Sequence, residues 1–393
     1  MLSVVHLGKF YPPASGGMET HLQTLARAQA DLGAAVRVVC VNHADWAGND
    51  VTSGRFRPIA TAEMHDGPVR VTRVGRLASV ARLDVCPQLP GRLRAAQRPG
   101  VVLHLHTPNP AMVLALVAAG VRVPLVVTHH SDVIRQRALR HALMPFERLV
   151  YRRAARVLAT SPAYQAGSRL LGALGDKVET VPLGIELAPY RDPSPESVAI
   201  AQKLRAEQGE PLWLMVGRLI YYKGLDVALR ALARVPGKLL VIGTGPLAAD
   251  GRRVAREQGL EQRVIWHGYA DPAEVVGAYH AATALWFPST ARSEAFGLTQ
   301  VEAMASGCPV INTAINGSGV PWVCRHEREG LTVPVGDDAA LAAAANRLLA
   351  EPGLRDRLGA GGRARASAEF DHVVMARRTL AVYRAVTRPR TAG

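Results

Sequence analysis

The chain has 393 residues, 48% of them hydrophobic, and a formal net charge of +15. This length is too great for one ordinary core and predicts two domains of roughly 180 to 200 residues each. The composition excludes a disordered or collagen-like chain. The excess of positive charge predicts an anionic partner, such as a phosphate-rich substrate or anionic lipid.

Residues 1–6 have the pattern of a β-strand, and no basic segment precedes an apolar core, so no signal peptide is predicted. The longest uncharged apolar run, 111–121, is too short to cross a bilayer. The four cysteines lack metal-ligand or CxxC spacing, which predicts reduced, partly buried thiols of a cytoplasmic protein. They are Cys40, Cys86, Cys308 and Cys324.

Apolar runs alternate with helical patterns along the first half of the chain, which predicts a parallel sheet covered by helices on both faces. The clearest helices are expected at 20–31 and 111–119. Strands are expected at 3–7, 36–41, 69–74, 101–105, 125–128, 157–159 and 178–181.

The first expected strand leads into a loop with paired glycines, Gly16 and Gly17, and a helix is expected to begin near Met18. Glycines at such a turn let the backbone approach an anion or a sugar closely. The loop lacks the GxGxxG pattern and the chain has no Walker sequence, which argues against hydride transfer and nucleoside triphosphatase activity. A purely structural turn is the alternative.

Histidines occur on or just after two of the expected strands. His129 and His130 follow the strand at 125–128, and one of them could hydrogen-bond a sugar hydroxyl or help to stabilise developing charge. The alternative for each is a satisfied polar residue at a strand end. His104 and His106 alternate along another strand, but no carboxylate or cysteine lies close by to complete a ligand set, so no metal site is predicted there.

The densest basic segment lies between Arg135 and Arg156 and interleaves arginines with apolar residues around Pro145. A basic amphipathic segment of this kind lies on an anionic membrane surface, and a partly solvated arginine-rich helix is the alternative. The chain has no aromatic-interleaved basic platform and no zinc-finger spacing, so nucleic acid is not predicted as a partner.

The polar, proline-containing stretch 189–211, with a short helix at 197–207, is the best candidate for a linker between two domains. The pattern then restarts as a second parallel sheet. Strands are expected at 213–216, 239–242, 264–266, 284–287 and 310–311, and helices at 224–234, 272–282, 298–306, 338–349 and 373–386.

Arg218 and Lys223 follow the first expected strand of the second half. The chain has five lysines among its 47 Lys and Arg residues, so composition explains a lysine here less easily. Two cations can hold a diphosphate and offset the charge of a leaving group, and solvated surface charge is the alternative. Because the chain has no Asp-x-Asp pair to clamp a metal on a sugar diphosphate, these cations are expected to replace the ion.

Glu294 and Glu302 lie eight residues apart across a turn that opens the helix at 298–306. The free N–H groups at that helix start would face a phosphate, and the two carboxylates flanking it suit the hydroxyls of a sugar and a ribose. The alternative is that Glu302 charges a first helical turn and Glu294 is a solvated loop residue. The further residues expected to bind the donor there are Phe296, Gly297, Leu298 and Thr299.

Five motifs, in this order, resemble glycosyltransferase family 4, whose enzymes have the GT-B fold. They are GGMET at 16–20, His130-Ser131-Asp132, VPLGI at 181–185, GRLIYYKG at 217–224 and the pair Glu294 and Glu302. The resemblance covers nearly the whole chain and implies two Rossmann-like α/β domains facing a central cleft. It implies an acceptor-binding domain at 1–188, a donor-binding domain at 189–370, and a last helix within 371–393 that packs back on the first domain.

The resemblance also implies retaining transfer from a nucleotide sugar, with no metal and no other cofactor. It implies that Arg218 and Lys223 hold the diphosphate, Glu294 the transferred sugar and Glu302 the ribose, while His130 acts between sugar and acceptor. Gly16 and Gly17 are expected to lie at the donor. The stretches HSDVIRQ and YYKG look most like mannosyl- and rhamnosyltransferases that build bacterial surface polysaccharides.

We therefore predict a hexosyltransferase, peripheral on the inner face of the cytoplasmic membrane, that moves mannose from GDP-mannose to a lipid-linked or polysaccharide acceptor. One alternative is a transferase that uses a UDP-sugar. Another is a GT-B nucleotide-sugar 2-epimerase, which would need no acceptor. A third is a non-catalytic module that binds anionic lipid or polysaccharide.

Overall fold

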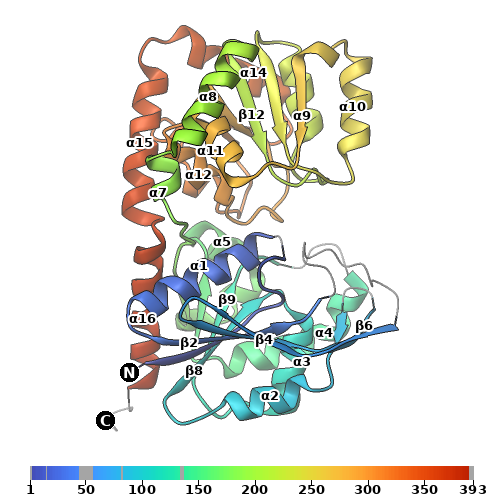
Figure 1. Cartoon of the computed structure of the whole chain (residues 1–393), viewed down its shortest axis with the longest axis vertical. Coiled ribbons are helices and arrows are strands. Elements are labelled where there is room, and N and C mark those ends of the chain that lie inside the picture. The colour runs from blue at the N-terminus through green and yellow to red at the C-terminus, as the bar shows by residue number, and fades with distance from the viewer. Residues whose placement is uncertain (1, 15, 44–55, 81–82, 133–136, 389–393) are drawn as a thin grey trace. The chain divides into compact units, whose positions relative to one another are not determined.

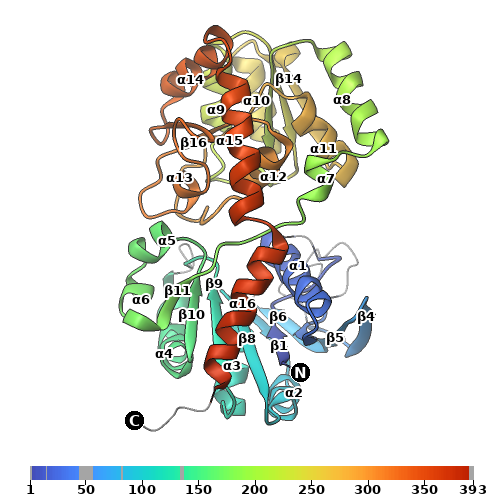
Figure 2. The same ribbon diagram turned by 90° about the vertical axis from the view of Figure 1, so that its left-hand side faces the viewer.

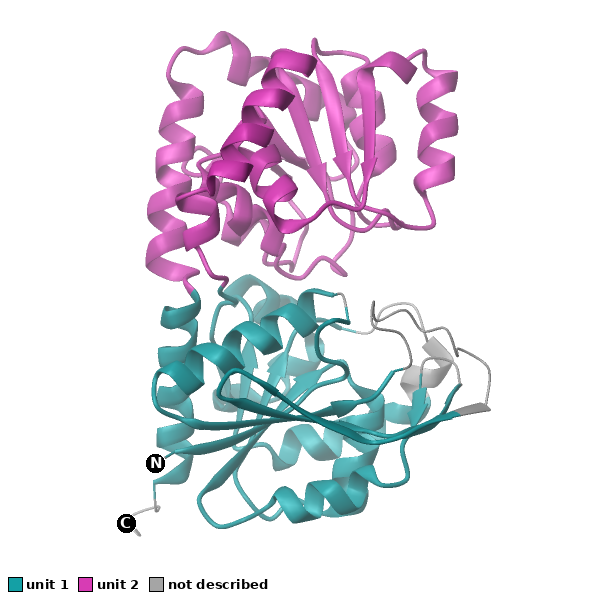
Figure 3. Ribbon diagram, viewed as in Figure 1, with its two compact units in different colours: residues 1–184, 372–393 teal, residues 185–371 magenta. Residues whose placement is uncertain are grey.

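The computed structural model describes residues 2–14, 16–43, 56–80, 83–132 and 137–388. The chain divides into two compact units (Figure 1, Figure 3). Unit 1 combines residues 1–184 with residues 372–393, and unit 2 comprises residues 185–371. The boundary falls a few residues before the predicted one. Each unit is an α/β structure with its own central sheet, as the alternating pattern predicted.

Unit 1 has a central sheet in the order β11-β10-β9-β8-β1-β2-β5-β4 and a small antiparallel sheet in the order β3-β6-β7. All neighbours in the central sheet are parallel except β4 and β5. The strands are β1 (Ser3–Leu7), β2 (Ala35–Val41), β3 (Phe56–Ile59), β4 (Ala62–Asp66), β5 (Val69–Val74), β6 (Arg76–Val80), β7 (Leu83–Val85), β8 (Val101–Thr107), β9 (Leu125–His129), β10 (Arg156–Ala159) and β11 (Val178–Thr180). The helices are α1 (Gly17–Asp31), α2 (Leu89–Ala96), α3 (Pro110–Ala119), α4 (Arg137–Arg153), α5 (Pro162–Gly167), α6 (Arg169–Gly172) and α16 (His372–Thr387).

Every strand predicted in the first half is present, and most of them are apolar runs that become buried within a parallel sheet. The strands that the sequence did not reveal are β3, β4, β6 and β7. In β4 the sequence AEMHD is almost entirely exposed, so it carries no apolar period from which a strand could be predicted.

The C-terminal helix α16 packs beside α1 within unit 1, as Figure 2 shows. Leu22 and Leu25 of α1 and Met375 and Leu380 of α16 share one buried apolar cluster with the sheet. A buried polar contact reinforces this packing, because the Gln29 side-chain amide donates to the Tyr383 hydroxyl at 3.2 Å. Helices α2 and α3 lie on the face of the sheet opposite α1 (Figure 1).

Unit 2 contains one wholly parallel sheet in the order β14-β13-β12-β15-β16-β17. Its strands are β12 (Leu212–Val216), β13 (Lys238–Ile242), β14 (Val264–Gly268), β15 (Ala284–Phe287), β16 (Val310–Thr313) and β17 (Gly330–Val333). Its helices are α7 (Ala188–Arg191), α8 (Pro195–Gln208), α9 (Leu225–Leu232), α10 (Ala248–Glu257), α11 (Pro272–Ala281), α12 (Leu298–Ser306), α13 (Val320–Val323), α14 (Asp338–Ala350) and α15 (Leu354–Glu369). Helices α9, α10 and α14 cover one face of the sheet, where Trp213 and Trp286 stack with ring centroids 5.1 Å apart.

The predicted linker at 189–211 is not a linker. These residues belong to unit 2, where α8 packs closely against α11. A Cβ at Gly277 of α11 would lie 2.7 Å from Ile200 Cγ2, so the two helices meet at a glycine. The polar residues in this stretch lie on the solvent-facing side of α8 and do not mark a linker between domains.

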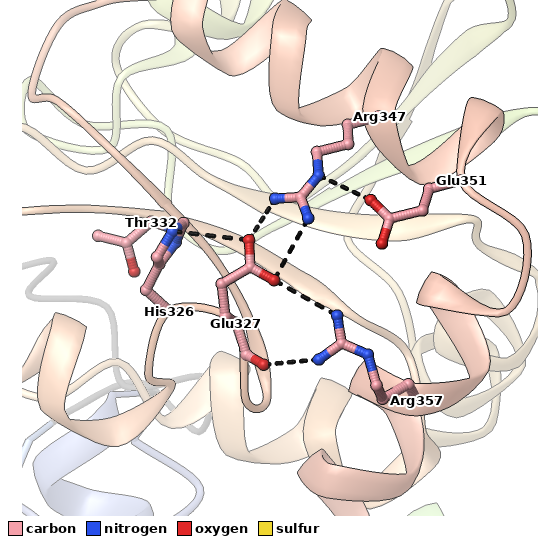
Figure 4. Close-up of polar contacts among 6 residues, drawn as sticks. All are labelled: His326, Glu327, Thr332, Arg347, Glu351 and Arg357. Carbon is pink, nitrogen blue, oxygen red and sulfur yellow. Dashed lines mark hydrogen bonds and ion pairs between the residues drawn. The ribbon is translucent and has the colours of Figure 1, made fainter.

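An ion-pair network holds the turn before β17 against α14 and α15 (Figure 4). Glu327, at φ 61, pairs with Arg347 and with Arg357, whose Nη2 lies 3.3 Å from Glu327 Oε2. Arg357 Nη1 also donates to the Glu327 carbonyl at 2.8 Å. These contacts fix an otherwise strained left-handed residue.

Two predictions about the whole chain are answered by the structure. All four cysteines are free and buried. Within the described part of the chain, no helix combines the length and apolar character needed to cross a membrane.

Candidate active site

The sheet of unit 2 reverses its direction of growth between β12 and β15. From β12 the chain adds β13 and β14 on one side and then β15, β16 and β17 on the other. Open parallel sheets bind ligands at such a switch point, outside the carboxyl ends of the strands. The β12–α9 loop carries Arg218 and Lys223, and the β15–α12 loop carries Glu294.

Hydrogen bonds hold these two loops together at the switch point. Thr290 N donates to the Tyr222 carbonyl at 2.7 Å, and Tyr221 Oη lies 2.9 Å from Ser293 Oγ. Gly224, at φ +71, sits so close to the second loop that a Cβ would lie 2.0 Å from the Pro288 carbonyl oxygen. Only glycine fits this close approach at a positive φ.

Lys223 and Glu294 form an ion pair across the two loops, with 2.6 Å between Nζ and Oε2. Their side chains are 13% and 11% exposed, so the pair is largely shielded from solvent. Ser289 Oγ also donates to Glu294 Oε2, at 3.3 Å, and the Phe287 ring centroid lies 5.1 Å from Lys223 Nζ. The predicted pair is therefore a single unit in which cation and carboxylate position each other.

Arg218 is exposed, and its guanidinium has no hydrogen bond or ion pair with the described residues. It follows β12 directly, beside Gly217, whose carbonyl oxygen would lie 2.0 Å from a Cβ at Gly243. The backbones of the turns after β12 and β13 therefore touch at these two glycines. An exposed arginine beside such a turn is available to an anionic ligand.

The start of α12 is arranged as predicted, with one exception. Gly297 caps the helix in the left-handed region at φ 80, and Leu298 begins it. Thr299 Oγ1 is buried and has no hydrogen-bond partner among the described residues. The exception is Phe296, whose ring is buried against Phe370 at 5.6 Å between centroids, so it offers a ligand only its backbone.

Glu302 lies about one turn inside α12 and accepts a hydrogen bond at Oε2 from the Tyr279 hydroxyl at 2.8 Å. Burial raises the pKa of Glu302 above its ordinary value, while Tyr279 and then Lys223 oppose that rise. The sequence did not reveal Tyr279, which comes from α11 and has no motif of its own.

The sheet of unit 1 has the same kind of switch point, between β1 and β8. Gly16 and Gly17 follow β1 and begin α1, as predicted. A Cβ at Gly16 would lie 2.3 Å from Glu19 Oε2, so a carboxylate stands over this glycine. That neighbour disfavours an anion and leaves a sugar hydroxyl as the better ligand for this turn.

His129 and His130 have different environments. His129 is buried between Tyr151 and Asp132, with Nδ1 at 2.6 Å from the Tyr151 hydroxyl and Nε2 at 3.2 Å from Asp132 Oδ1. His130 is partly exposed, and burial, followed by His129, lowers the pKa of His130 to about 3. His130 is thus a neutral imidazole available to a ligand, whereas His129 is a structural residue.

His130 also belongs to a histidine cluster that the sequence did not reveal. Its Nε2 lies 3.1 Å from His106 Nδ1, and His106 Nε2 lies 3.0 Å from His6 Nδ1. The sequence neighbours of His104 and His106 include no carboxylate or cysteine, so no metal site is predicted there from the sequence. In the structure, β1, α1 and β9 bring further histidines to β8. Two groups of three have ring nitrogens within 4.8 Å of one another, His6-His104-His106 and His21-His106-His130.

Sequence comparisons agree with these two units. The family described as Glycosyl transferase 4-like domain matches residues 16–184, and Glycosyl transferases group 1 matches residues 197–365. The chain is 29% identical to O-antigen chain mannosyltransferase C of Escherichia coli, over 95% of this chain and 96% of the relative. It is 33% identical to D-rhamnosyltransferase WbpZ of Pseudomonas aeruginosa, over 67% of this chain and 68% of the relative.

The fold is also that of solved glycosyltransferase structures. Sucrose-phosphate synthase from Thermosynechococcus elongatus aligns with a TM-score of 0.78 at 26% identity, covering 98% of this chain and 99% of that structure. Unit 2 has a paired lysine and glutamate at its switch point, and unit 1 has a neutral histidine at its own. Both units also match glycosyltransferase family models. The chain is an enzyme of glycosyltransferase family 4, with the GT-B fold.

Proposed function

We propose that this glycosyltransferase moves mannose from GDP-mannose, with retention of configuration and without a metal, to a lipid-linked or polysaccharide acceptor of a bacterial surface glycan. The observation that carries this proposal is the Lys223–Glu294 pair at the switch point of unit 2. A cation and a carboxylate held 2.6 Å apart match a ligand that presents a phosphate next to sugar hydroxyls.

Each residue of this site has a role that follows from its contacts. Lys223 Nζ, already oriented by Glu294, donates to a phosphate oxygen and stabilises the negative charge that develops on the leaving diphosphate. Arg218 adds a planar guanidinium suited to two phosphate oxygens. The N–H groups of Leu298 and Thr299 at the start of α12 supply the remaining donors.

The carboxylates bind the hydroxyl groups of the donor. Glu294 accepts from the transferred sugar through Oε1, because its contacts with Lys223 and Ser289 in the described part of the chain involve Oε2. Glu302 accepts from the ribose. His130, as a neutral imidazole, accepts a hydrogen bond close to the reacting sugar. Because fixed cations and helix N–H groups neutralise the diphosphate, the transfer step needs no divalent ion.

Mannose is favoured as the transferred sugar by the names of two relatives, a mannosyltransferase and a D-rhamnosyltransferase. D-rhamnose is mannose without its 6-hydroxyl, so both sugars share the axial 2-hydroxyl. A UDP-sugar is the alternative donor. Relatives that carry the name D-inositol 3-phosphate glycosyltransferase, such as the one from Xylanimonas cellulosilytica at 30% identity, show that the chain is also similar to transferases with other names.

The exposed residues of helix α4 favour an anionic membrane surface as a further partner. Phe146 and Leu149 are 40% and 55% exposed on this helix, although Arg135 and Gln136 of the predicted segment lie outside the described residues. A pocket of about 910 Å³ close to the end of α4 is lined by Arg122, Arg152, Arg153, Arg156, Lys177 and Arg388, among others. Exposed apolar side chains beside clustered arginines suit peripheral binding at the inner face of the cytoplasmic membrane.

A donor panel tests the proposal. Thermal shift is measured with GDP-mannose, GDP-D-rhamnose, UDP-glucose and dTDP-rhamnose in EDTA, and nucleotide release is followed with and without a lipid-linked acceptor. GDP-mannose at about 100 times its dissociation constant should stabilise the protein by about 2.7 kcal/mol and should release GDP only with acceptor. Stabilisation by UDP-sugars alone, or conversion of the donor without acceptor, would overturn it.

Retention and membrane binding are tested separately. The anomeric configuration of the product, read by NMR, should match that of the donor, and inversion would contradict the retaining mechanism. The double variant with Phe146→Ser and Leu149→Ser should sediment less with anionic vesicles than the wild type does. Val198→Ser, at a site of similar exposure on α8, should sediment as the wild type does. Equal sedimentation of both variants would exclude α4 from membrane binding.

A further inference from the structure

Three histidines of unit 1 bring ring nitrogens close to one another. His21 comes from α1, His106 from β8 and His130 from the end of β9, and one nitrogen of each lies within 4.8 Å of the other two. The 3.1 Å between His106 Nδ1 and His130 Nε2 is close to the separation of about 3.3 Å that two nitrogens adopt on a tetrahedral ion with bonds of about 2.0 to 2.1 Å. An ion bound by both would replace the hydrogen bond that joins these two nitrogens.

His21 provides an independent reason to expect a ligand at this point. The side chain is 3% exposed, and neither ring nitrogen has a hydrogen-bond partner among the described residues. Its ring packs edge-on to His130, with centroids 4.8 Å apart. A buried imidazole without a partner is destabilising, and an ion between these rings would satisfy one of its nitrogens.

The residues behind His106 fix which of its ring nitrogens carries the proton. Gln29 donates through its amide nitrogen to Tyr383, so Gln29 Oε1 accepts from His6 Nε2 at 2.9 Å. His6 Nδ1 is then the acceptor for His106 Nε2–H at 3.0 Å, and His106 Nδ1 is unprotonated. Metal-binding histidines typically donate their other N–H in this way to an outer partner that fixes the ring.

The second group, His6-His104-His106, is a poorer site. Both ring nitrogens of His104 are occupied, by Tyr383 at 2.5 Å and Thr128 at 2.7 Å, and His6 and His104 are completely buried. His130, in contrast, is partly exposed, which gives an ion access to the first group.

We propose that His21, His106 and His130 bind one divalent ion of the zinc class, with water in the fourth position. Three neutral imidazoles suit zinc, copper or nickel rather than magnesium or calcium, which prefer oxygen ligands. The ion is not a cofactor for transfer. Because the ion occupies His130, zinc should inhibit the enzyme. Only this expected inhibition rests on the role proposed above for His130.

Titration calorimetry with Zn²⁺ on the EDTA-treated and dialysed full chain tests the site. The wild type should bind one more zinc ion than His21→Phe, which removes a ligand and fills its buried space with an apolar ring. His65→Ala is the matched control, because His65 is an exposed histidine of the same unit, and it should bind as the wild type does. Co²⁺ in place of Zn²⁺ should give visible absorption of a tetrahedral site in the wild type and the control, and lose it in His21→Phe.

Equal zinc stoichiometry and affinity in the wild type and His21→Phe would overturn the proposal. If His21→Phe fails to fold by circular dichroism, His130→Gln replaces it with the same expected loss of one ion, because His130 is only partly buried. Binding is measured without donor or acceptor, so failure of the zinc site and failure of the proposed transfer are separate results.

Discussion

The two units place very different polar groups at equivalent points of similar sheets. At the switch point of unit 1, neutral histidines contact one another, and burial holds the pKa of His6 at about 4 and that of His130 at about 3. At the switch point of unit 2, a lysine and a glutamate remain as an ion pair 2.6 Å apart. The edge of each sheet thus fixes where a ligand binds, while the side chains that follow each strand decide the charge of the ligand that fits.

The largest effect is expected from Lys223→Ala. The change would leave the 11%-exposed Glu294 carboxylate without its cation, and breaking such a buried pair destabilises a protein by about 3–5 kcal/mol. Transfer should be abolished, and urea unfolding should show the loss of stability.

Lys203→Ala is the control for this prediction, because the Lys203–Glu207 pair spans 3.9 Å and its side chains are 72% and 53% exposed. Its unfolding midpoint should match that of the wild type. The double variant with alanine at Lys223 and Glu294 should recover part of the stability lost by Lys223→Ala. Wild-type stability in Lys223→Ala would show that the pair does not matter in solution.

A second effect is expected in the pH dependence of nucleotide binding. The pKa of Glu302 is raised by burial, so this carboxylate takes up a proton at a higher pH than an ordinary glutamate. Affinity for GDP should therefore weaken as the pH falls through that pKa. The effect on folding has the opposite sign. The folded state binds the Glu302 proton more tightly than the unfolded state does, so the stability that this proton contributes is lost as the pH rises.

Glu302→Gln removes the titrating group while keeping an acceptor oxygen. Its GDP affinity, measured by calorimetry, should be weaker than that of the wild type at neutral pH and less dependent on pH. An unchanged acid limb in this variant would assign the titration to another residue.

A smaller effect is expected from Thr299→Val. The Thr299 hydroxyl is buried without a partner among the described residues, so an isosteric valine should leave the stability unchanged or raise it by about 1 kcal/mol. GDP affinity should fall by about five- to tenfold if this hydroxyl meets a phosphate. Thr332→Val is the matched control, since Thr332 Oγ1 is also buried without a partner, and it should change stability alone. A GDP affinity equal to the wild type in Thr299→Val would remove Thr299 from the site.

The smallest effect is expected from Glu327→Gln, which weakens the pairs with Arg347 and Arg357. Partly exposed pairs contribute little, and the Arg357 bond to the Glu327 carbonyl remains. The melting temperature should fall by less than about 3 °C. A fall as large as that of Lys223→Ala would mean that this network matters as much as the Lys223–Glu294 pair to the stability of unit 2.

The sequence predicted the two sheets because parallel strands are continuous apolar runs, and helix α12 and strands β1, β5 and β15 have the predicted bounds. It missed β4, whose residues are exposed, and β17, where GLTV is too short to separate from a loop. It placed a linker at α8 because polarity cannot tell a solvated helix face from a free connection.

The candidate site was predictable where one loop carries the residues. Gly297, Leu298, Thr299 and Glu302 follow one another in sequence, and their arrangement matches the prediction. The contacts of Glu302 with Tyr279 and of His106 with His6 join residues that are far apart along the chain. Such residues come together only through the packing of the folded chain. The spacing of residues within a single sequence does not predict these contacts.

The most direct test of the account is Glu294→Gln, examined for GDP binding by calorimetry and for mannosyl transfer from GDP-mannose. Glu294 is proposed to contact the transferred sugar and to orient Lys223, not to contact the nucleotide. GDP affinity should stay within about threefold of the wild type, while turnover should fall by about 10² to 10³. Turnover near the wild-type rate, or loss of GDP binding with the fold intact, would contradict the site described here.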